Sequence, residues 1–170
     1  MNPPRQSPTI NAKKGNIISI ANVEFIRLIK DILGRGASLR FSAGGGSMIP
    51  FIIDGDVLTL VPLKRGLSYG GVYAFIDPQG SKLIVHRLIG RKNGKFIFKG
   101  DNNPESDNSV PLENVLGKVV RVERGKKRVR LGLGVERVVI SLMSRKNMLL
   151  VMTSMAYKIY RFTRKVLPCL

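Results

Sequence analysis

Short segments in which apolar and polar residues alternate dominate the middle of the chain. In residues 37–43, Leu39, Phe41 and Ala43 share one face and polar side chains share the other. This period of two is typical of a half-buried strand. Further strands are predicted from similar or continuously apolar segments at residues 51–53, 57–61, 70–76, 82–88, 96–98, 115–123 and 128–131. Turn residues separate these segments, so the pattern predicts a mainly β, antiparallel core.

The sequence Asp54-Gly55-Asp56 is typical of a tight hairpin turn, because Asp-Gly readily adopts the positive φ that such turns need. Residues 51–53 and 57–61 would be its two strands. A glycine-rich turn at residues 44–50 lies just before this hairpin and just after the 37–43 strand. We therefore expect strands to brace the glycine-rich turn on both sides.

Helical spacing of apolar residues appears near both ends of the chain. Residues 22–33 carry an apolar face, with Asn22 as a possible cap and Gly34 or Gly36 as possible stops. Residues 136–167 are also predicted to be helical, with an apolar stripe and a basic face in the second half, formed by Met148, Met152, Met155, Ile159 and Phe162 and by Lys158, Arg161 and Lys165. This divides the chain into an N-terminal arm and amphipathic helix (1–36), a β domain (37–131) and a basic C-terminal helical tail (132–170).

The formal net charge is +18 at pH 7, and much of the excess lies in residues 117–170, where Glu123 and Glu136 are the only acidic residues. A basic amphipathic helix suits an anionic lipid surface, so we expect a peripheral contact with an anionic membrane. The alternative is a methionine stripe that packs on the domain while the cations are solvated. The tail has no recognisable nucleic-acid-binding motif and few aromatic residues, which argues against nucleic acid.

Neither a signal peptide nor a transmembrane helix is predicted. No apolar segment follows Met1, and the uncharged stretch between Lys146 and Lys158 is too short to cross a hydrocarbon core of about 30 Å. Cys169, the single cysteine, excludes an internal disulfide. We expect a cytoplasmic protein, or one peripheral at the cytoplasmic membrane face. No cofactor or metal is expected, because one histidine and one distant cysteine do not supply a usual ligand set.

Candidate chemistry centres on Ser47, which follows three glycines that leave its hydroxyl and N–H unobstructed. A hydroxyl needs a neighbouring base, and His86 is the only histidine. Its place between aliphatic residues on a predicted strand disfavours the imidazolium form and keeps the ring a competent base. The polar loop at 99–107 could supply a carboxylate that orients the ring. Plainer interpretations are a flexible Gly-Ser loop, a structural histidine and an Asx-rich turn.

Three segments together resemble the signal peptidase family of serine endopeptidases. Gly46-Ser47-Met48-Ile49-Pro50 with Gly55-Asp56 resembles its nucleophile box. Val85-His86-Arg87 is similar to the second box of the endoplasmic-reticulum-type Ser-His branch, found also in archaea. Two further likenesses are to the third box and to the strand that ends the core, carried by Lys99-Gly100-Asp101-Asn102-Asn103 with Asp107 and by Gly117-Lys118-Val119-Val120. The resemblance spans roughly residues 37–123 and implies a coiled antiparallel β core of the signal-peptidase and LexA-like type.

The resemblance also implies roles. Ser47 would be the nucleophile, His86 the general base and Asp107 the acid that orients it. Asp101 is the alternative orienting acid, or else shapes the loop. The Ser47 N–H would stabilise the oxyanion. The supporting residues of the boxes are Gly46, Met48 and Arg87. The implied substrate is an extended precursor or leader peptide with small residues before the cut, bound as an added strand.

Two departures from the family pattern leave alternatives open. Gly45 stands where the family has a serine that helps hold the oxyanion, a loss of about 2–4 kcal/mol if nothing replaces it. An amphipathic helix stands where the family has a membrane anchor; we expect it to pack on the core, and substrate binding is the alternative. A catalytically weak or inactive peptide- or membrane-binding module is therefore the second hypothesis. A self-cleaving DNA-binding repressor is the third; the lack of a lysine base and of a helix-turn-helix before Ser47 argues against it.

Overall fold

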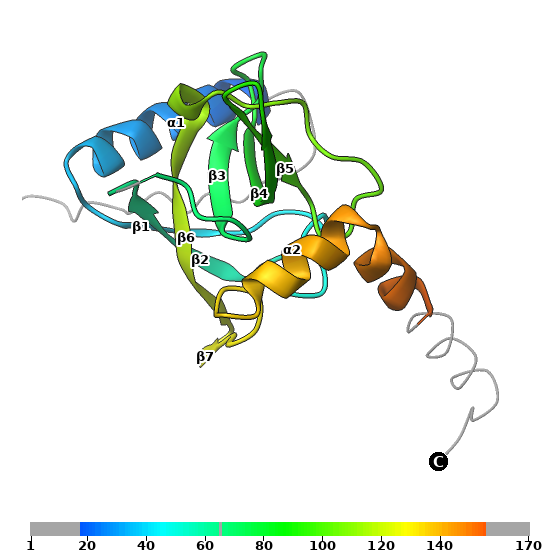
Figure 1. The fold of residues 1–170 in the computed structure, drawn as a ribbon. Helices are drawn as coiled ribbons and strands as arrows, with labels where there is room; N and C mark the ends of the chain where they lie inside the picture. Colours follow the sequence, from blue (N-terminus) through cyan, green and yellow to red (C-terminus); the bar gives the residue numbers. More distant parts are fainter. Residues whose placement is uncertain (1–17, 65, 156–170) are drawn as a thin grey trace, which may run out of the picture.

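A computed structural model of the chain describes residues 18–64 and 66–155 (Figure 1). Its strands form one antiparallel sheet in the order β1-β2-β6-β3-β4-β5, with β7 paired to β6. The bounds of these strands are Leu39–Ser42 (β1), Val57–Pro62 (β2), Val72–Ile76 (β3), Leu83–Lys92 (β4), Lys95–Lys99 (β5), Val115–Arg124 (β6) and Lys127–Arg128 (β7). A short 3-10 helix, η1 (Leu112–Asn114), precedes β6. The expected mainly β, antiparallel core is confirmed.

Apolar side chains cover both faces of the sheet at its centre. All five residues of β3 are buried, and four of them divide between two apolar clusters: Val72 and Ala74 join one, Tyr73 and Phe75 the other. This explains why β3 reads as a continuous apolar run in the sequence. The register shifts at Thr59/Leu60, at Ala74/Phe75 and at Leu88/Gly90. Such bulges increase the local twist, which coils the sheet around its two cores.

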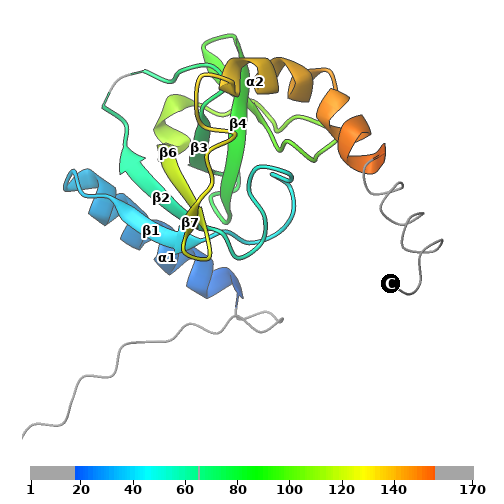
Figure 2. The same ribbon diagram turned by 90° about the horizontal axis from the view of Figure 1, so that it is seen from below.

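The helix predicted at residues 22–33 is present as α1 (Ile18–Gly34), which packs against β1, β2 and β6 (Figure 2). Ile29 and Leu33 enter the core cluster that holds the inner face of β2. The helix begins before the predicted start, so Asn22 lies inside it and is not its cap. A single capping residue contributes only about 1 kcal/mol, and a favourable upstream sequence overrides it. The expectation that this helix packs on the core is confirmed.

The predicted strand at residues 51–53 is wrong. The N–H groups of Phe51 and Ile52 both donate to the Met48 carbonyl at 3.1 Å, which makes this segment a compact turn. The strand pairing expected between residues 51–53 and 57–61 is not formed. Instead, the strand at β1 continues the pairing, and the Ala43 N–H donates to the Asp56 carbonyl at 2.7 Å. A proline just before an apolar triplet favours such a turn, because it restricts the preceding backbone. The hairpin therefore joins β1 to β2 and carries the glycine-rich segment as its long connection.

The continuous helix predicted at 136–167 is interrupted. Helix α2 (Arg137–Arg145) ends before Asn147, which has a φ of 59°, and a second helical segment covers residues 148–155. The buried Lys99 ammonium donates to the Ser144 carbonyl at 2.6 Å and to the Asn147 side chain, and so satisfies groups at the helix end. Five residues of the predicted stripe and basic face lie outside the described residues, namely Lys158, Ile159, Arg161, Phe162 and Lys165. The N-terminal arm at residues 1–17 and Cys169 also lie outside them.

Two further observations complete the fold. The last predicted strand, 128–131, is shorter than expected, since β7 pairs only Lys127 and Arg128 with β6. Within the described ranges, none of the helices is both long and apolar enough to span a bilayer.

Candidate active site

Ser47, His86 and Asp107 meet in one chain of contacts. The Nε2 atom of His86 lies 3.0 Å from the Ser47 Oγ, although the two residues are 39 positions apart. On the other side of the ring, Nδ1 lies 2.6 Å from an Asp107 carboxylate oxygen. His86 is only 6% exposed, and its imidazole meets Phe75 edge-on at a centroid distance of 6.2 Å. A hydroxyl, an imidazole and a carboxylate in this order can activate the hydroxyl as a nucleophile.

The sheet holds the histidine and the aspartate in place. His86 lies in β4 opposite Tyr73 of β3, so the ladder fixes the direction of its side chain. Ile84 on the same face joins the second apolar cluster, whereas Leu83 and Val85 pack on the first, as the alternation predicted. Asp107 follows β5, and its N–H donates to the Phe98 carbonyl at 2.9 Å. Backbone hydrogen bonds on both sides therefore orient the pair before any substrate binds.

The loop after β5 supports the nucleophile turn from behind. Asn102 donates its N–H to the Ser47 carbonyl at 2.8 Å and its side-chain amide to the Gly46 carbonyl at 3.2 Å. A Cβ atom at Gly100 would lie 2.7 Å from the Ser47 carbonyl oxygen, so only glycine fits this close approach. The Ser47 N–H makes no hydrogen bond within the described residues, which leaves it able to bind an oxyanion.

Asp101 binds Arg87 instead of His86. The two side chains are fully buried and are joined by contacts of 2.8 Å from Nε and 2.6 Å from Nη2. The remaining guanidinium nitrogen donates to the carbonyls of Gly70 and Gly132, and the group lies 5.4 Å from the Phe51 ring centroid. Arg87 therefore connects the loop after β5 to the backbone at Gly70 and Gly132 and to the Phe51 ring. The geometry assigns the ring contact to Asp107 and a loop-shaping contact to Asp101.

A second carboxylate braces the turn after the nucleophile. Arg124 of β6 donates two hydrogen bonds of 2.9 Å to Asp56, and the Ile53 N–H adds a third. The hydrogen bonds from the guanidinium hold the pKa of Asp56 below its usual range, although burial opposes this. Asp54 accepts the Gly45 N–H at 2.9 Å. Asp56 thus supports the segment after Ser47 through its hydrogen bonds to Arg124 and Ile53. The expected two-residue hairpin turn is not formed here.

Gly45 and Gly46 place no side chain beside the nucleophile. Gly45 has a φ of 84°, which disfavours a serine at this position. A Cβ at Gly46 would lie 3.1 Å from the Ile49 side chain. Met48 is buried in the core below the turn and also lines the groove described next. Position 45 therefore offers no side-chain donor beside the Ser47 N–H.

A groove of about 520 Å³ opens at Ser47 and His86 and is lined mainly by apolar side chains of α1, β1, β2 and β4. Two strand edges border it. β1 is the end strand of the sheet, and residues 83–86 of β4 pair with β3 only, because pairing to β5 starts at Arg87. Among the described residues, β1 and residues 83–86 of β4 therefore each have one edge that pairs with no strand. An extended peptide could therefore add to the sheet there.

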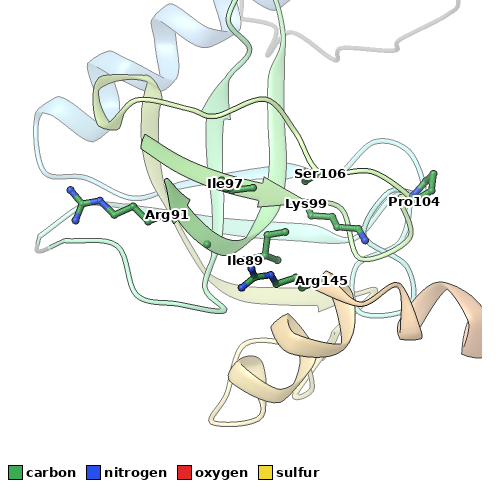
Figure 3. A pocket seen from close by; sticks show the side chains of 8 residues that line it. Ile89, Arg91, Ile97, Lys99, Pro104, Ser106 and Arg145 are labelled. Atoms are coloured by element: carbon green, nitrogen blue, oxygen red, sulfur yellow. The ribbon is translucent and has the colours of Figure 1, made fainter. Parts of the chain in front are cut away.

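A second cavity, of about 330 Å³, lies between β4, β5 and α2 (Figure 3). Its lining includes three basic side chains, those of Arg91, Lys99 and Arg145, beside apolar ones, and Arg91 extends away from Lys99. Burial lowers the pKa of the Lys99 ammonium, while the nearby Asp101 opposes this. Ser47, His86 and Asp107 do not line this cavity.

Three supporting contacts were not predicted from the sequence. Arg124 lies 68 residues from Asp56, and no local pattern links them. Asn102 was recognised within its motif, but its bonds to the Ser47 turn were not. Phe25 lines the groove, whereas the sequence favoured packing of its helix on the core and left substrate binding as the alternative.

Comparison with known proteins adds no further constraint: no family model matches the chain, and no curated protein matches it. The case for function therefore depends on the residues and their geometry.

Proposed function

We propose that the protein is a serine endopeptidase that cleaves precursor or leader peptides through a Ser47–His86–Asp107 mechanism. The contacts of 3.0 and 2.6 Å on the two sides of the His86 ring carry this proposal. A hydroxyl–imidazole–carboxylate chain with a buried imidazole, at the mouth of an apolar groove, has the parts that acyl transfer requires.

In this mechanism, the Ser47 Oγ attacks a peptide carbonyl while His86 Nε2 takes the hydroxyl proton. Asp107 stabilises the imidazolium that forms, and the Ser47 N–H donates to the oxyanion. The imidazolium then protonates the leaving amine, and an acyl-enzyme remains. Water, deprotonated by His86, attacks the ester and releases the new carboxyl terminus.

The coiled antiparallel sheet and the order of the three motifs support a core of the signal-peptidase and LexA-like type. By that likeness, the substrate binds as an added strand and has small residues just before the cut. The two free strand edges beside Ser47 agree with this mode of binding.

New N-termini in a host-cell extract would test the proposal by mass spectrometry after treatment with wild type, Ser47→Ala or Ser109→Ala. Ser109 is exposed and lies outside the groove, so its variant is the matched control. We expect the same cuts from wild type and Ser109→Ala and none from Ser47→Ala, because only Ser47 can form the acyl-enzyme.

Identical peptides in all three samples, with folded wild type, would contradict the peptidase. The second hypothesis, a catalytically inactive peptide-binding module, would then apply. The positive φ at Gly45 favours it, since this site lacks the second oxyanion donor of the family. Peptide binding without a covalent acyl-enzyme, measured by intact mass, would support it.

We also propose a peripheral contact with anionic lipid at the cytoplasmic membrane face. Met148, Met152 and Met155 are 49%, 57% and 57% exposed, whereas Leu149 of the same segment is buried. The methionines therefore face away from the domain, near the exposed Arg145 and Lys146. An apolar stripe beside cations suits the headgroup region of a bilayer.

A further inference from the structure

A separate cavity, of about 250 Å³, lies beside the loop that joins β2 to β3. Its lining includes three polar side chains that are joined through Ser68. The Nζ atom of Lys118 lies 3.2 Å from the Ser68 Oγ, and the Tyr73 hydroxyl lies 3.1 Å from the same atom. The candidate catalytic residues do not line this cavity, so its polar cluster has no part in the proposed cleavage.

The sheet fixes the positions of two members of this cluster. Lys118 of β6 is paired with Val61 of β2 on one side and with Tyr73 of β3 on the other. Directly paired residues project to the same face of a sheet, which places all three beside the cavity. His86 is the next partner in this row, two strands and about 10 Å from Lys118. The cavity and the candidate active site are therefore separate sites on one face.

A tight turn places Ser68 against the tyrosine. The Gly71 N–H donates to the Ser68 carbonyl at 3.0 Å, and the Ser68 N–H donates to the Tyr73 hydroxyl at 2.8 Å. A Cβ atom at Gly71 would lie 2.7 Å from the Tyr73 ring, so only glycine fits this approach. Tyr73 itself is 1% exposed. The cluster is thus held by its surroundings before any ligand binds.

The cluster has more hydrogen-bond donors than acceptors. The Lys118 ammonium has three N–H groups and donates one of them to Ser68. Among the described residues, no carboxylate forms a salt bridge with Lys118, and no acidic side chain lines the cavity. A group that only accepts hydrogen bonds and carries negative charge would complete this arrangement. An ionised carboxylate and a phosphate both have this property.

The rest of the lining favours the carboxylate. Val61, Pro62 and Leu63 supply an apolar wall, and Lys118 is the only cation that contacts the polar cluster, while Lys64 is exposed. A mostly apolar cavity with a few fixed polar groups is typical of a small-ligand site. We propose that this cavity binds a carboxylate that is attached to a compact apolar group. The inference does not depend on the proposed peptidase function.

Calorimetry on the full chain would test the site with N-acetyl-leucine, its uncharged amide, isocaproate and inorganic phosphate. The amide has the same apolar group and lacks the charge. The amide chemical shifts of Ser68 and Tyr73 would locate the bound ligand. The variants are Lys118→Met and Ser68→Ala. Lys95→Met is the matched control, because Lys95 is exposed and does not line the cavity.

We expect wild type and Lys95→Met to bind N-acetyl-leucine at least about tenfold more tightly than its amide, because the hydrogen bonds to the carboxylate are charge-assisted. Lys118→Met should weaken the binding of N-acetyl-leucine by about tenfold or more. Ser68→Ala should also weaken it, and this variant keeps the test available if Lys118→Met does not fold. Tighter binding of N-acetyl-leucine than of isocaproate would identify a peptide carboxyl terminus as the ligand, and the reverse order a free carboxylic acid.

Equal affinity for the acid and the amide would overturn the inference, and so would the absence of saturable binding or an unchanged Kd in the folded variants. Tighter binding of inorganic phosphate would overturn the choice of a carboxylate. Chemical-shift changes at Ser47 and His86 without changes at Ser68 would place the ligand in the other groove and would also overturn it. None of these measurements follows cleavage, so the peptidase proposal is tested separately by Ser47→Ala.

Discussion

At the scale of single residues, the imidazole of His86 contacts Ser47 through one nitrogen and Asp107 through the other. The two aspartates of the third motif have different partners, because the Arg87 guanidinium donates to both carboxylate oxygens of Asp101. A carboxylate on Nδ1 selects the tautomer whose Nε2 can accept the Ser47 proton. The division of work between Asp107 and Asp101 can be measured directly.

Asp107→Asn should lower kcat by about 10³–10⁴-fold, because the amide stabilises the wrong tautomer and cannot stabilise the imidazolium. Its melting temperature should stay close to that of wild type. Asp101→Asn leaves the buried Arg87 charge without its partner and should reduce the free energy of unfolding by roughly 3–5 kcal/mol. Steady-state kinetics and thermal melts would separate the two effects. The reverse pattern would assign the orienting role to Asp101.

At the scale of elements, the nucleophile turn depends on strands that are distant in the sequence. Asp56 connects the end of this turn to Arg124 at the end of β6, and Asn102 connects its middle to the loop after β5. The turn itself contains three consecutive glycines, which on their own would leave it mobile. Its geometry therefore depends on contacts made by neighbouring elements.

Asp56→Asn should reduce stability at neutral pH by about 2 kcal/mol, the scale of hydrogen bonds to a charged group. The pKa of Asp56 is lowered in the folded state, so its contribution is present above the ordinary aspartate pKa and is lost as pH falls through the lowered value. Urea unfolding between pH 2 and 7 should therefore show a smaller acid-induced loss of stability for the variant than for wild type.

Asp31→Asn, which changes an exposed carboxylate on α1, is the control and should resemble wild type. If Asp56→Asn and Asp31→Asn gave the same pH profile, the Asp56–Arg124 pair would not contribute to stability.

At the scale of the whole molecule, the C-terminal helices carry the exposed methionines and the neighbouring cations, and they also contact the loop that supports Ser47. Figure 1 shows α2 and residues 148–155, in yellow to orange, as two successive helices outside the sheet. Thr153 Oγ1 lies 3.5 Å from the Asn102 side chain, and Asn102 holds the Ser47 turn. A membrane bound by this surface would therefore lie near the loop that supports the nucleophile.

Co-sedimentation with vesicles would test this surface. Wild type should bind phosphatidylcholine vesicles that contain an anionic phospholipid more strongly than pure phosphatidylcholine, with a loss at high salt. A Met148→Glu/Met152→Glu variant should bind at least about tenfold more weakly, because two methionine side chains that enter the bilayer would contribute several kcal/mol. Leu112→Glu, at an exposed apolar residue of η1, is the control. Equal binding by wild type and the double variant would exclude the methionine surface.

The sequence by itself determined the strand-rich core, the amphipathic helix before it and the three candidate residues of the site, since alternation, glycine turns and short motifs are local signals. Only the tertiary structure decided that Asp107 contacts His86, that residues 51–53 form a turn, that the C-terminal helix breaks at Asn147 and that Phe25 lines the groove. These outcomes depend on groups far apart in the chain, such as Arg87 with Asp101 and Lys99 with Ser144. Local patterns carry no record of such partners, because burial and pairing between distant segments arise only once the sheet has brought them together.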